Sequence, residues 1–257
     1  MLLKFSNLVK AASVALLFMS APSIAGLIDF NDYSHGTVIH EQYRGVTITA
    51  NNINPLVRDY AVVYDTVPGI NPSEGKNNSY DPDLEGPNWG NSNIDDVDSL
   101  YLGRVLIVQE NNEGCDTGVC TKPDDEGDRP AGSIDFEFDT AISDFGFDLL
   151  DVEGPQEYGQ DSGYLAAFYD ENGVEVAKIG FGSFVNDGIN NAQYGDNSVN
   201  RISPIDLTQY GNVYRVQIQF GGSAGIDNVR FTEVPEPSTS VLFGLVLAGL
   251  IWRRKRA

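Results

Sequence analysis

Apolar and polar side chains alternate along several stretches of the chain. In residues 134–139 (Ile-Asp-Phe-Glu-Phe-Asp) the apolar side chains fall on one face of an extended segment and the acidic ones on the other. Residues 213–220 behave similarly, with apolar side chains in phase at positions 216, 218 and 220. A period of two is the pattern of a β-strand that buries one face.

Turn-forming residues separate these stretches, and no long amphipathic helix lies between them. The predicted strands span residues 27–30, 46–50, 61–64, 104–109, 133–138, 142–149, 164–169, 175–181, 213–220 and 226–232. Asp170-Glu171-Asn172-Gly173, between two of them, has the composition of a hairpin turn. Strands at this spacing predict an all-β fold, an antiparallel β-sandwich of the jelly-roll type.

Two long stretches, residues 66–99 and 111–130, interrupt the strand pattern. Both are rich in Asn, Asp, Gly and Pro, and both are acidic. Loops of this length are usually functional or disordered. We expect them to be insertions at one edge of the sandwich.

The N-terminus has the three parts of a secretory signal peptide. Lys4 and Lys10 supply positive charge, residues 11–21 form the apolar segment, and Ser23 and Ala25 are the small residues at positions −3 and −1. We therefore expect a signal helix within residues 1–25, with cleavage after Ala25.

The C-terminus carries a second apolar segment with a basic end. Residues 241–252 are uncharged and are followed by Arg253-Arg254-Lys255-Arg256. As a helix the uncharged stretch is roughly 18 to 23 Å long, short of a hydrocarbon core of about 30 Å. The positive-inside rule predicts a short transmembrane helix with its cations in the cytoplasm. The chain then divides into a signal peptide (1–25), a β-sandwich domain (26–233) and a C-terminal segment (234–257).

Val234-Pro235-Glu236-Pro237-Ser238, with the helix and the basic end, resembles the PEP-CTERM sorting signal of Gram-negative bacteria. The resemblance implies cleavage by exosortase, a membrane-embedded enzyme, with these sorting and processing residues: Pro235, Glu236, Pro237, Arg253 and Arg254. It also implies that the protein is transiently anchored in the inner membrane and then located at the cell surface or in the extracellular matrix. There it would be associated with exopolysaccharide or biofilm. An ordinary single-pass C-terminal anchor is the alternative.

Removal of the two terminal segments makes the net charge of the chain more negative. The formal net charge of the whole chain is −21. Without Lys4, Lys10 and the four C-terminal cations, ten Lys and Arg remain against 37 Asp and Glu, a net charge of −27. Such a surface repels nucleic acid and anionic membranes, and it favours divalent cations. Solubility at the cell surface is the simpler explanation for most of these charges.

Cys115 and Cys120 are the two cysteines, and in an exported protein we expect them to form a local disulfide. The bridge would close the loop of residues 111–122. A metal site at the cysteines lacks partners, because the only histidines, His35 and His40, are far away in the sequence.

Residues 81–86 (Asp-Pro-Asp-Leu-Glu-Gly) match the opening of a calcium loop, with acids at its first, third and fifth positions. The twelfth position is Ser92 instead of a glutamate. We therefore expect a looser site held by Asp81, Asp83 and Glu85, with a solvated turn as the alternative.

The two ends of the domain suggest another calcium site. Ile28-Asp29-Phe30 and Gly225-Ile226-Asp227-Asn228-Val229 resemble the first and last strands of calcium-containing carbohydrate-binding jelly rolls. The resemblance implies one structural Ca²⁺ held by Asp29, Asp227 and nearby carbonyls. A residue that caps neighbouring amides is the alternative for Asp227.

Residues 63–66, 81–87, 103–108 and 147–153 resemble a recurring bacterial surface domain that has no assigned activity. The resemblance supports an exported surface module. It groups four acids around one loop region: Asp65, Asp83, Asp151 and Glu153.

Catalytic motifs have little support. Residues 221–225 match the G-x-S-x-G pattern, but they join two predicted strands and no histidine follows Ser223. A glycine-rich hairpin explains them better. Paired carboxylates for glycoside hydrolysis are compatible with 37 acids, but such abundance does not single out a pair.

Trp89 lies in a polar loop, where its ring can either stack on a sugar or pack on the sandwich.

We expect a non-enzymatic, exported surface or matrix protein. The first alternative is a calcium-stabilised carbohydrate-binding module with Trp89 as a contact. The second is an exported, carboxylate-dependent glycoside hydrolase.

Overall fold

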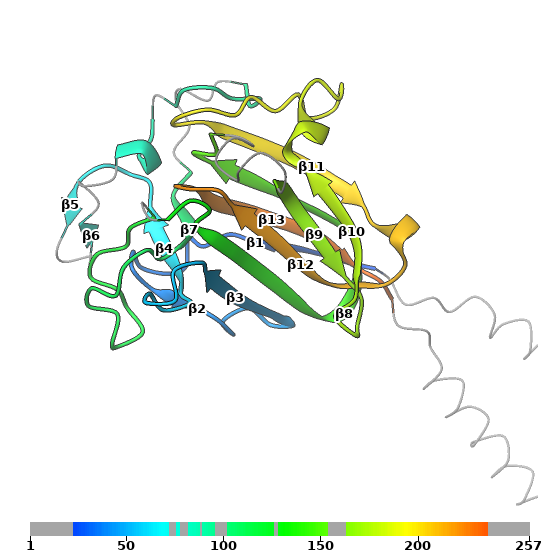
Figure 1. Cartoon of the computed structure of the whole chain (residues 1–257), viewed down its shortest axis with the longest axis horizontal. Helices are drawn as coiled ribbons and strands as arrows, with labels where there is room; N and C mark the ends of the chain where they lie inside the picture. Colours follow the sequence, from blue (N-terminus) through cyan, green and yellow to red (C-terminus); the bar gives the residue numbers. More distant parts are fainter. Residues whose placement is uncertain are drawn as a thin grey trace, which may run out of the picture. The chain divides into compact units, whose positions relative to one another are not determined.

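In the computed structural model a 19-residue strand, β8 (Gly132–Leu150), is the centre of an antiparallel sheet (Figure 1). The structure describes residues 23–71, 76–77, 82–87, 89–95, 102–125, 128–153 and 163–235 of the 257. The chain divides into two units, one of residues Ala25–Glu233 and one of Met1–Ile24 with Val234–Ala257. The fold described below is that of the first unit.

Twelve further strands accompany β8, together with three short 3₁₀ helices among the described residues. The strands are β1 (Ile24–Ile28), β2 (Val38–Ile39), β3 (Val46–Asn52), β4 (Ala61–Asp65), β5 (Ile70–Asn71), β6 (Lys76–Asn77), β7 (Arg104–Val108), β9 (Tyr164–Tyr169), β10 (Glu175–Gly180), β11 (Val199–Asp206), β12 (Val213–Phe220) and β13 (Gly225–Glu233). The 3₁₀ helices are η3 (Pro82–Leu84), η6 (Phe181–Phe184) and η7 (Thr208–Tyr210). The all-β, antiparallel prediction is confirmed.

The two halves of β8 belong to two parts of the sheet. Residues 132–138 pair with β3 on one side and with residues of β12 on the other, and β12 continues to β9 and β10. Residues 142–150 pair with β11 on one side and with β13 on the other, and β13 continues to β7, β4 and β2. We call these parts the first and second halves of the sheet; β1 pairs with β13 in the second half.

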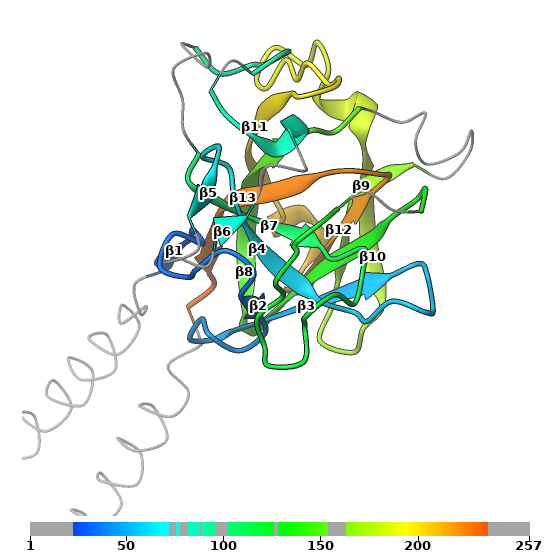
Figure 2. The ribbon, with the colours of Figure 1, turned by 90° about the vertical axis from the view of Figure 1, so that its left-hand side faces the viewer.

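The main hydrophobic core lies between the two halves, which makes the fold sandwich-like. Phe136 of the first half and Phe145 of the second have ring centroids 5.7 Å apart, and both are fully buried. In Figure 2, β9, β10 and β12 lie to the right of β4 and β7. Burying aromatic side chains of this size is the largest favourable contribution to such a fold.

A second core covers the outer face of the second half. Tyr64 of β4, Ile107 of β7 and Leu150 of β8 pack there against Trp89 and Leu84, which come from the long loops. The described parts of these loops therefore cover a sheet face, whereas the sequence predicted insertions at an edge.

The strand predictions differ from the structure at β8 and β11, and the two-residue strands β2, β5 and β6 were not predicted either. Residues 133–138 and 142–149 were expected to be separate strands, but they are continuous in β8. The strand β11 was not predicted, because Pro204 and the polar residues around it interrupt the apolar pattern. Proline is tolerated there since β8 is the only described strand that pairs with β11, and the register shifts between Ile202 and Ile205.

Of the predicted signal helix the structure describes only residues 23–25, two of which lie in β1, and the predicted C-terminal helix lies outside the described residues. Among the described residues, no helix is long and apolar enough to cross a membrane. Ala25, the expected cleavage residue, lies in β1, so cleavage after it would leave this strand to begin at Gly26.

Candidate functional site

Asp227 lies in β13, inside a row of side chains that crosses three strands. The register places it opposite Asp148 of β8, which in turn lies opposite Arg201 of β11. Directly opposed residues share one face of an antiparallel pair. Both acids have no exposed surface, so this row brings two carboxyl groups into the interior of the protein.

Asp148 is fully compensated by positive charge. Nε and Nη2 of Arg201 donate to its Oδ1 and Oδ2 at 3.0 and 2.8 Å, and Nη2 of Arg230 donates to Oδ1 at 2.8 Å. Nδ2 of Asn228 adds a hydrogen bond to Oδ2 at 3.2 Å. These charge-assisted hydrogen bonds offset the cost of burying the Asp148 side chain.

Asp227 has a different environment. Its Oδ2 accepts a hydrogen bond from Nδ2 of Asn228 at 2.8 Å, but its buried Oδ1 has no hydrogen-bond partner. Burial is the main cause that raises the pKa of Asp227 to about 8, and the charges of Asp148 and Asp29 act in the same direction. At neutral pH this side chain therefore holds a proton unless a cation lies beside it.

A β-bulge places these polar groups together. The register of β13 against β8 shifts between Asp227 and Arg230, and Asn228 adopts a left-handed conformation with φ of 48°. Bulges redirect side chains in this way, and asparagine tolerates the left-handed region better than most residues. The amide of Asn228 thus reaches both Asp148 and Asp227.

Asp29 follows β1, the strand that pairs with β13. Its Oδ1 accepts a hydrogen bond from the backbone N–H of Asn31 at 3.3 Å, and its carbonyl oxygen accepts one from the hydroxyl of Tyr43 at 2.5 Å. Burial raises the pKa of Tyr43, and the charges of Asp29 and Asp227 contribute to this shift. The two acids predicted from the ends of the domain therefore share one electrostatic environment.

A second group of acids lies around the described part of the first long loop. Asp83 lies in η3, and burial raises its pKa, with contributions from the charges of Asp196 and Glu153. Burial raises the pKa of Asp151 to about 8; the hydrogen bond from the backbone N–H of Asn197 opposes the shift, and the charges of Asp83 and Asp196 add to it. The structure thus gathers three of the four acids grouped by sequence and adds Asp196.

The remaining predicted acids have other surroundings. Asp65 faces Arg104, with Oδ2 3.8 Å from Nε. Glu85 follows η3 directly, and Asp81 lies outside the described residues. In the part of the chain that the structure describes, no group of three or more His, Cys, Asp or Glu side chains is arranged to hold a metal ion.

The loop with the G-x-S-x-G pattern joins β12 to β13, as predicted. The hydroxyl of Ser223 donates to Oδ2 of Asp125 at 3.0 Å, and the N–H of Ala224 donates to the same oxygen at 2.7 Å. Asp125, which is buried, therefore fastens this loop to the second long loop.

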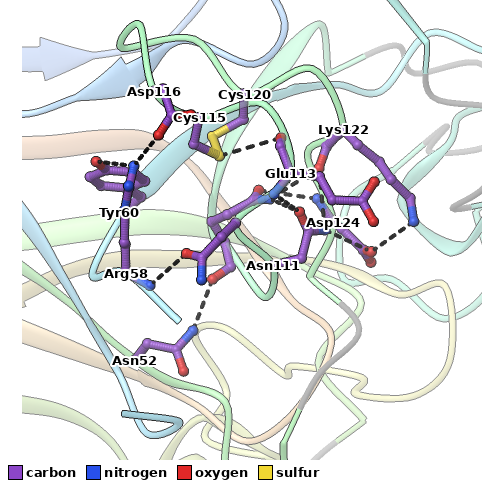
Figure 3. Close-up of a disulfide and its surroundings, with 12 residues drawn as sticks. Asn52, Arg58, Tyr60, Asn111, Glu113, Cys115, Asp116, Cys120, Lys122 and Asp124 are labelled. Atoms are coloured by element: carbon purple, nitrogen blue, oxygen red, sulfur yellow. Dashed lines mark hydrogen bonds and ion pairs between the residues drawn. A yellow bond between two sulfur atoms is a disulfide. The ribbon is translucent and has the colours of Figure 1, made fainter. Parts of the chain in front are cut away.

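The predicted disulfide between Cys115 and Cys120 is present (Figure 3). It closes a loop that is fastened to the segment between β3 and β4. Nη1 of Arg58 lies 3.0 Å from Oδ1 of Asp116, and the backbone N–H of Arg58 donates to Asn112 at 3.0 Å. Two irregular segments are thereby fixed against each other.

Trp89 packs in the second core with 3% of its surface exposed. Its indole lies against Gly86, where an added Cβ would come within 2.5 Å of the ring. A ring buried to this extent offers no face to a sugar, and its burial agrees with the alternative in which Trp89 packs on the sandwich.

Sequence reasoning missed the arginine-compensated group around Asp148. A signal for it existed, because Asp148 is the one charged residue in the apolar run 145–150. Its partners Arg201 and Arg230 are distant in sequence, and only the strand register brings them together.

Comparison with known proteins bears on the C-terminus. Residues 233–256 match the family model of the PEP-CTERM protein-sorting motif. No curated protein matches the chain. The motif implies export, a transient C-terminal membrane anchor, and sorting by exosortase, a membrane enzyme. Pro235 is the last described residue of this segment; the predicted processing residues Glu236, Pro237, Arg253 and Arg254 lie outside the described part.

Proposed function

We propose that the processed chain is a non-enzymatic protein of the cell surface or extracellular matrix that associates with exopolysaccharide. The observation that carries this proposal is the sorting motif at residues 233–256, which begins at the last residue of β13. The domain is thus joined directly to a segment that marks it for export and processing. Its expected net charge of −27 suits a soluble protein outside the cell.

One feature of the domain supports a role in binding, and another argues against a catalytic role for Ser223. A jelly-roll-like sandwich, the finer form of the fold that we propose, is an architecture that recurs in lectin-type domains. The G-x-S-x-G serine is engaged with Asp125, which suits a structural loop. Turnover of a polysaccharide that is lost when one acid is replaced would instead favour the glycoside hydrolase.

Calcium stabilisation is a second candidate property, and the unpartnered Oδ1 of Asp227 favours it. A hard cation beside this oxygen would compensate the buried charge, and Asp29 would supply further oxygen ligands. Ca²⁺ would act there as a structural ion that ties the first strand to the last.

Polysaccharide binding by the secreted protein, measured on a glycan array with calcium and with EDTA, tests these proposals. Binding in both conditions supports the matrix protein without a calcium requirement. Binding that is lost in EDTA supports the calcium-stabilised carbohydrate-binding module. Absence of binding in both conditions contradicts the association with exopolysaccharide.

A further inference from the structure

A groove of about 530 Å³ opens between the two halves of the sheet. One wall is formed by β2 and the histidine that follows it, another by β3, and the third by the two residues before β4. The lining side chains are Val38, Ile39, His40, Ile48, Thr49, Ala50, Asp59 and Tyr60. Its volume and its mixture of apolar surface with a few polar groups are those of a small-ligand site.

The outer edge of β3 forms part of this groove, and only a short piece of it is open. The N–H of Ile48 donates to the carbonyl of His40 at 2.8 Å, so Ile48 points its backbone groups away from β8. Ala50 is two residues further and has the same orientation, because backbone groups alternate along an antiparallel strand. The backbone N–H of Asn52 donates to Oδ1 of Asp59 at 2.8 Å.

This arrangement excludes a peptide strand as the occupant. Adding a strand to a sheet edge requires several consecutive free backbone groups. Here the edge is closed on both sides of Ala50, by the carbonyl of His40 and by the carboxylate of Asp59. A single free residue provides hydrogen bonds to a small hydroxylated group instead.

The polar groups that face the groove are mainly acceptors. Nδ1 of His40 lies 3.1 Å from the carbonyl oxygen of Ile48 and is the donor of that hydrogen bond, and its Nε2 lies 3.7 Å from Oε1 of Glu41. Asp59 uses Oδ1 for Asn52, so Oδ2 remains for a ligand. The hydroxyl of Thr49 completes a set that suits a ligand rich in hydroxyl donors.

Tyr60 supplies a ring whose position is fixed before a ligand arrives. The guanidinium of Arg58 lies 5.8 Å from the ring centroid, and Nη1 lies 3.4 Å from the tyrosine hydroxyl. Figure 3 shows Arg58 between Tyr60 and Asp116, which belongs to the disulfide-closed loop. A ring held in place loses little conformational entropy on binding, which favours affinity.

Charge narrows the ligand class further. The carboxylate of Asp59 faces the groove, and the nearby cation Arg58 is already paired with Asp116. The domain as a whole is strongly acidic. An anionic polymer would therefore be repelled, whereas a neutral sugar would bind without a charge penalty.

We propose that this groove binds a segment of a neutral polysaccharide, with the ring of Tyr60 against the apolar face of one sugar. Asp59, His40, Thr49 and the edge of β3 at Ala50 bind its hydroxyl groups. The inference rests on the proposed association with exopolysaccharide and names the site and the charge class of the polymer.

The test measures binding of the secreted protein to a soluble β-glucan, a galactomannan and polygalacturonate by affinity electrophoresis. Tyr60→Ala is expected to weaken binding to the neutral polymers about tenfold or more, and Thr49→Val, which keeps the side-chain shape, by about threefold. Tyr214→Ala, on β12 and outside the groove, is the matched control. Thermal unfolding checks that each variant is folded.

The outcomes separate the site from the function. Neutral polymers that bind the wild type and Tyr60→Ala equally overturn the groove and leave the proposed function standing. Binding by the wild type to polygalacturonate alone overturns the inference of a neutral ligand. If the wild type binds none of the three polymers, the association with polysaccharide fails, and the groove proposal fails with it.

Discussion

At the scale of single residues, two neighbouring acids show how the hydrogen-bond partners of a buried carboxyl group determine its role. Asp148 and Asp227 are equally buried and directly opposite each other. Two arginines compensate Asp148, whereas Asp227 has one oxygen without a partner. Asp148 thus fixes the strands around it, whereas burial raises the pKa of Asp227.

Replacing Asp227 by asparagine should reduce the pH dependence of stability when EDTA is present, and the raised pKa of Asp151 accounts for part of what remains. The folded-state pKa of about 8 lies above the unfolded value near 3.9, so the stabilisation is complete below pH 4 and is lost as the pH rises to about 8. At pH 8 we expect Asp227→Asn to be more stable than the wild type by about 3 to 5 kcal/mol in urea unfolding. The exposed Asp139→Asn should follow the wild type, and a wild-type profile without this loss would contradict the buried-carboxyl interpretation.

Calcium should restore the stability that the wild type loses as the pH rises. About 1 mM Ca²⁺, in the range used by extracellular modules, should raise the thermal midpoint of the wild type by several degrees at pH 7.5. Asp227→Asn should show no shift, and Asp83→Asn should behave as the wild type. Loss of the calcium-induced shift in Asp83→Asn alone would place the calcium site in the first long loop. No heat in calorimetry and no thermal shift for the wild type would end the calcium proposal.

At the scale of elements, β8 depends on close approach to β11. Gly146 lies where an added Cβ would meet the backbone of Ile202 and Pro204 at 2.8 to 3.0 Å. Backbone atoms in a paired strand cannot yield as a flexible side chain can, so Gly146→Ala should destabilise the fold by about 1 to 3 kcal/mol. The matched control Gly182→Ala places its methyl group in open space. Equal urea midpoints for both variants would show that β11 is not held against β8 as described.

Strand positions were predictable where the apolar pattern was regular. The ranges 164–169 and 213–220 coincide with β9 and β12, because both strands have distinct turns at their ends. The join within β8 was not predictable, since Asp139 and Thr140 resemble a turn but remain extended. The pair Asp29 and Asp227 could be inferred from the two ends of the domain. Its neighbours Arg201 and Arg230 could not, because sequence does not specify the register across strands.

At the scale of the whole molecule, processing at both ends can be measured directly. Mass spectrometry of the protein from an exporting host should find a chain that begins at Gly26 and ends near Pro235-Glu236-Pro237. Replacing Glu236 by alanine should cause the C-terminal segment to be retained, because the processing enzyme no longer recognises its motif. Arg44→Ala, within the domain, serves as the control. Persistence of the wild-type chain through Ala257 in exosortase-containing cells would contradict the processing proposal.

The place of β13 in the sheet has a consequence for the order of events during export. β13 is the last strand among the residues that the structure describes, yet it lies between β8 and β7 and also pairs with β1. In a chain that crosses the membrane from its N-terminus, the second half of the sheet cannot close until Glu233 has emerged. The sorting motif, residues 233–256, follows directly. The sheet can therefore close only when the chain has emerged as far as the start of its sorting motif.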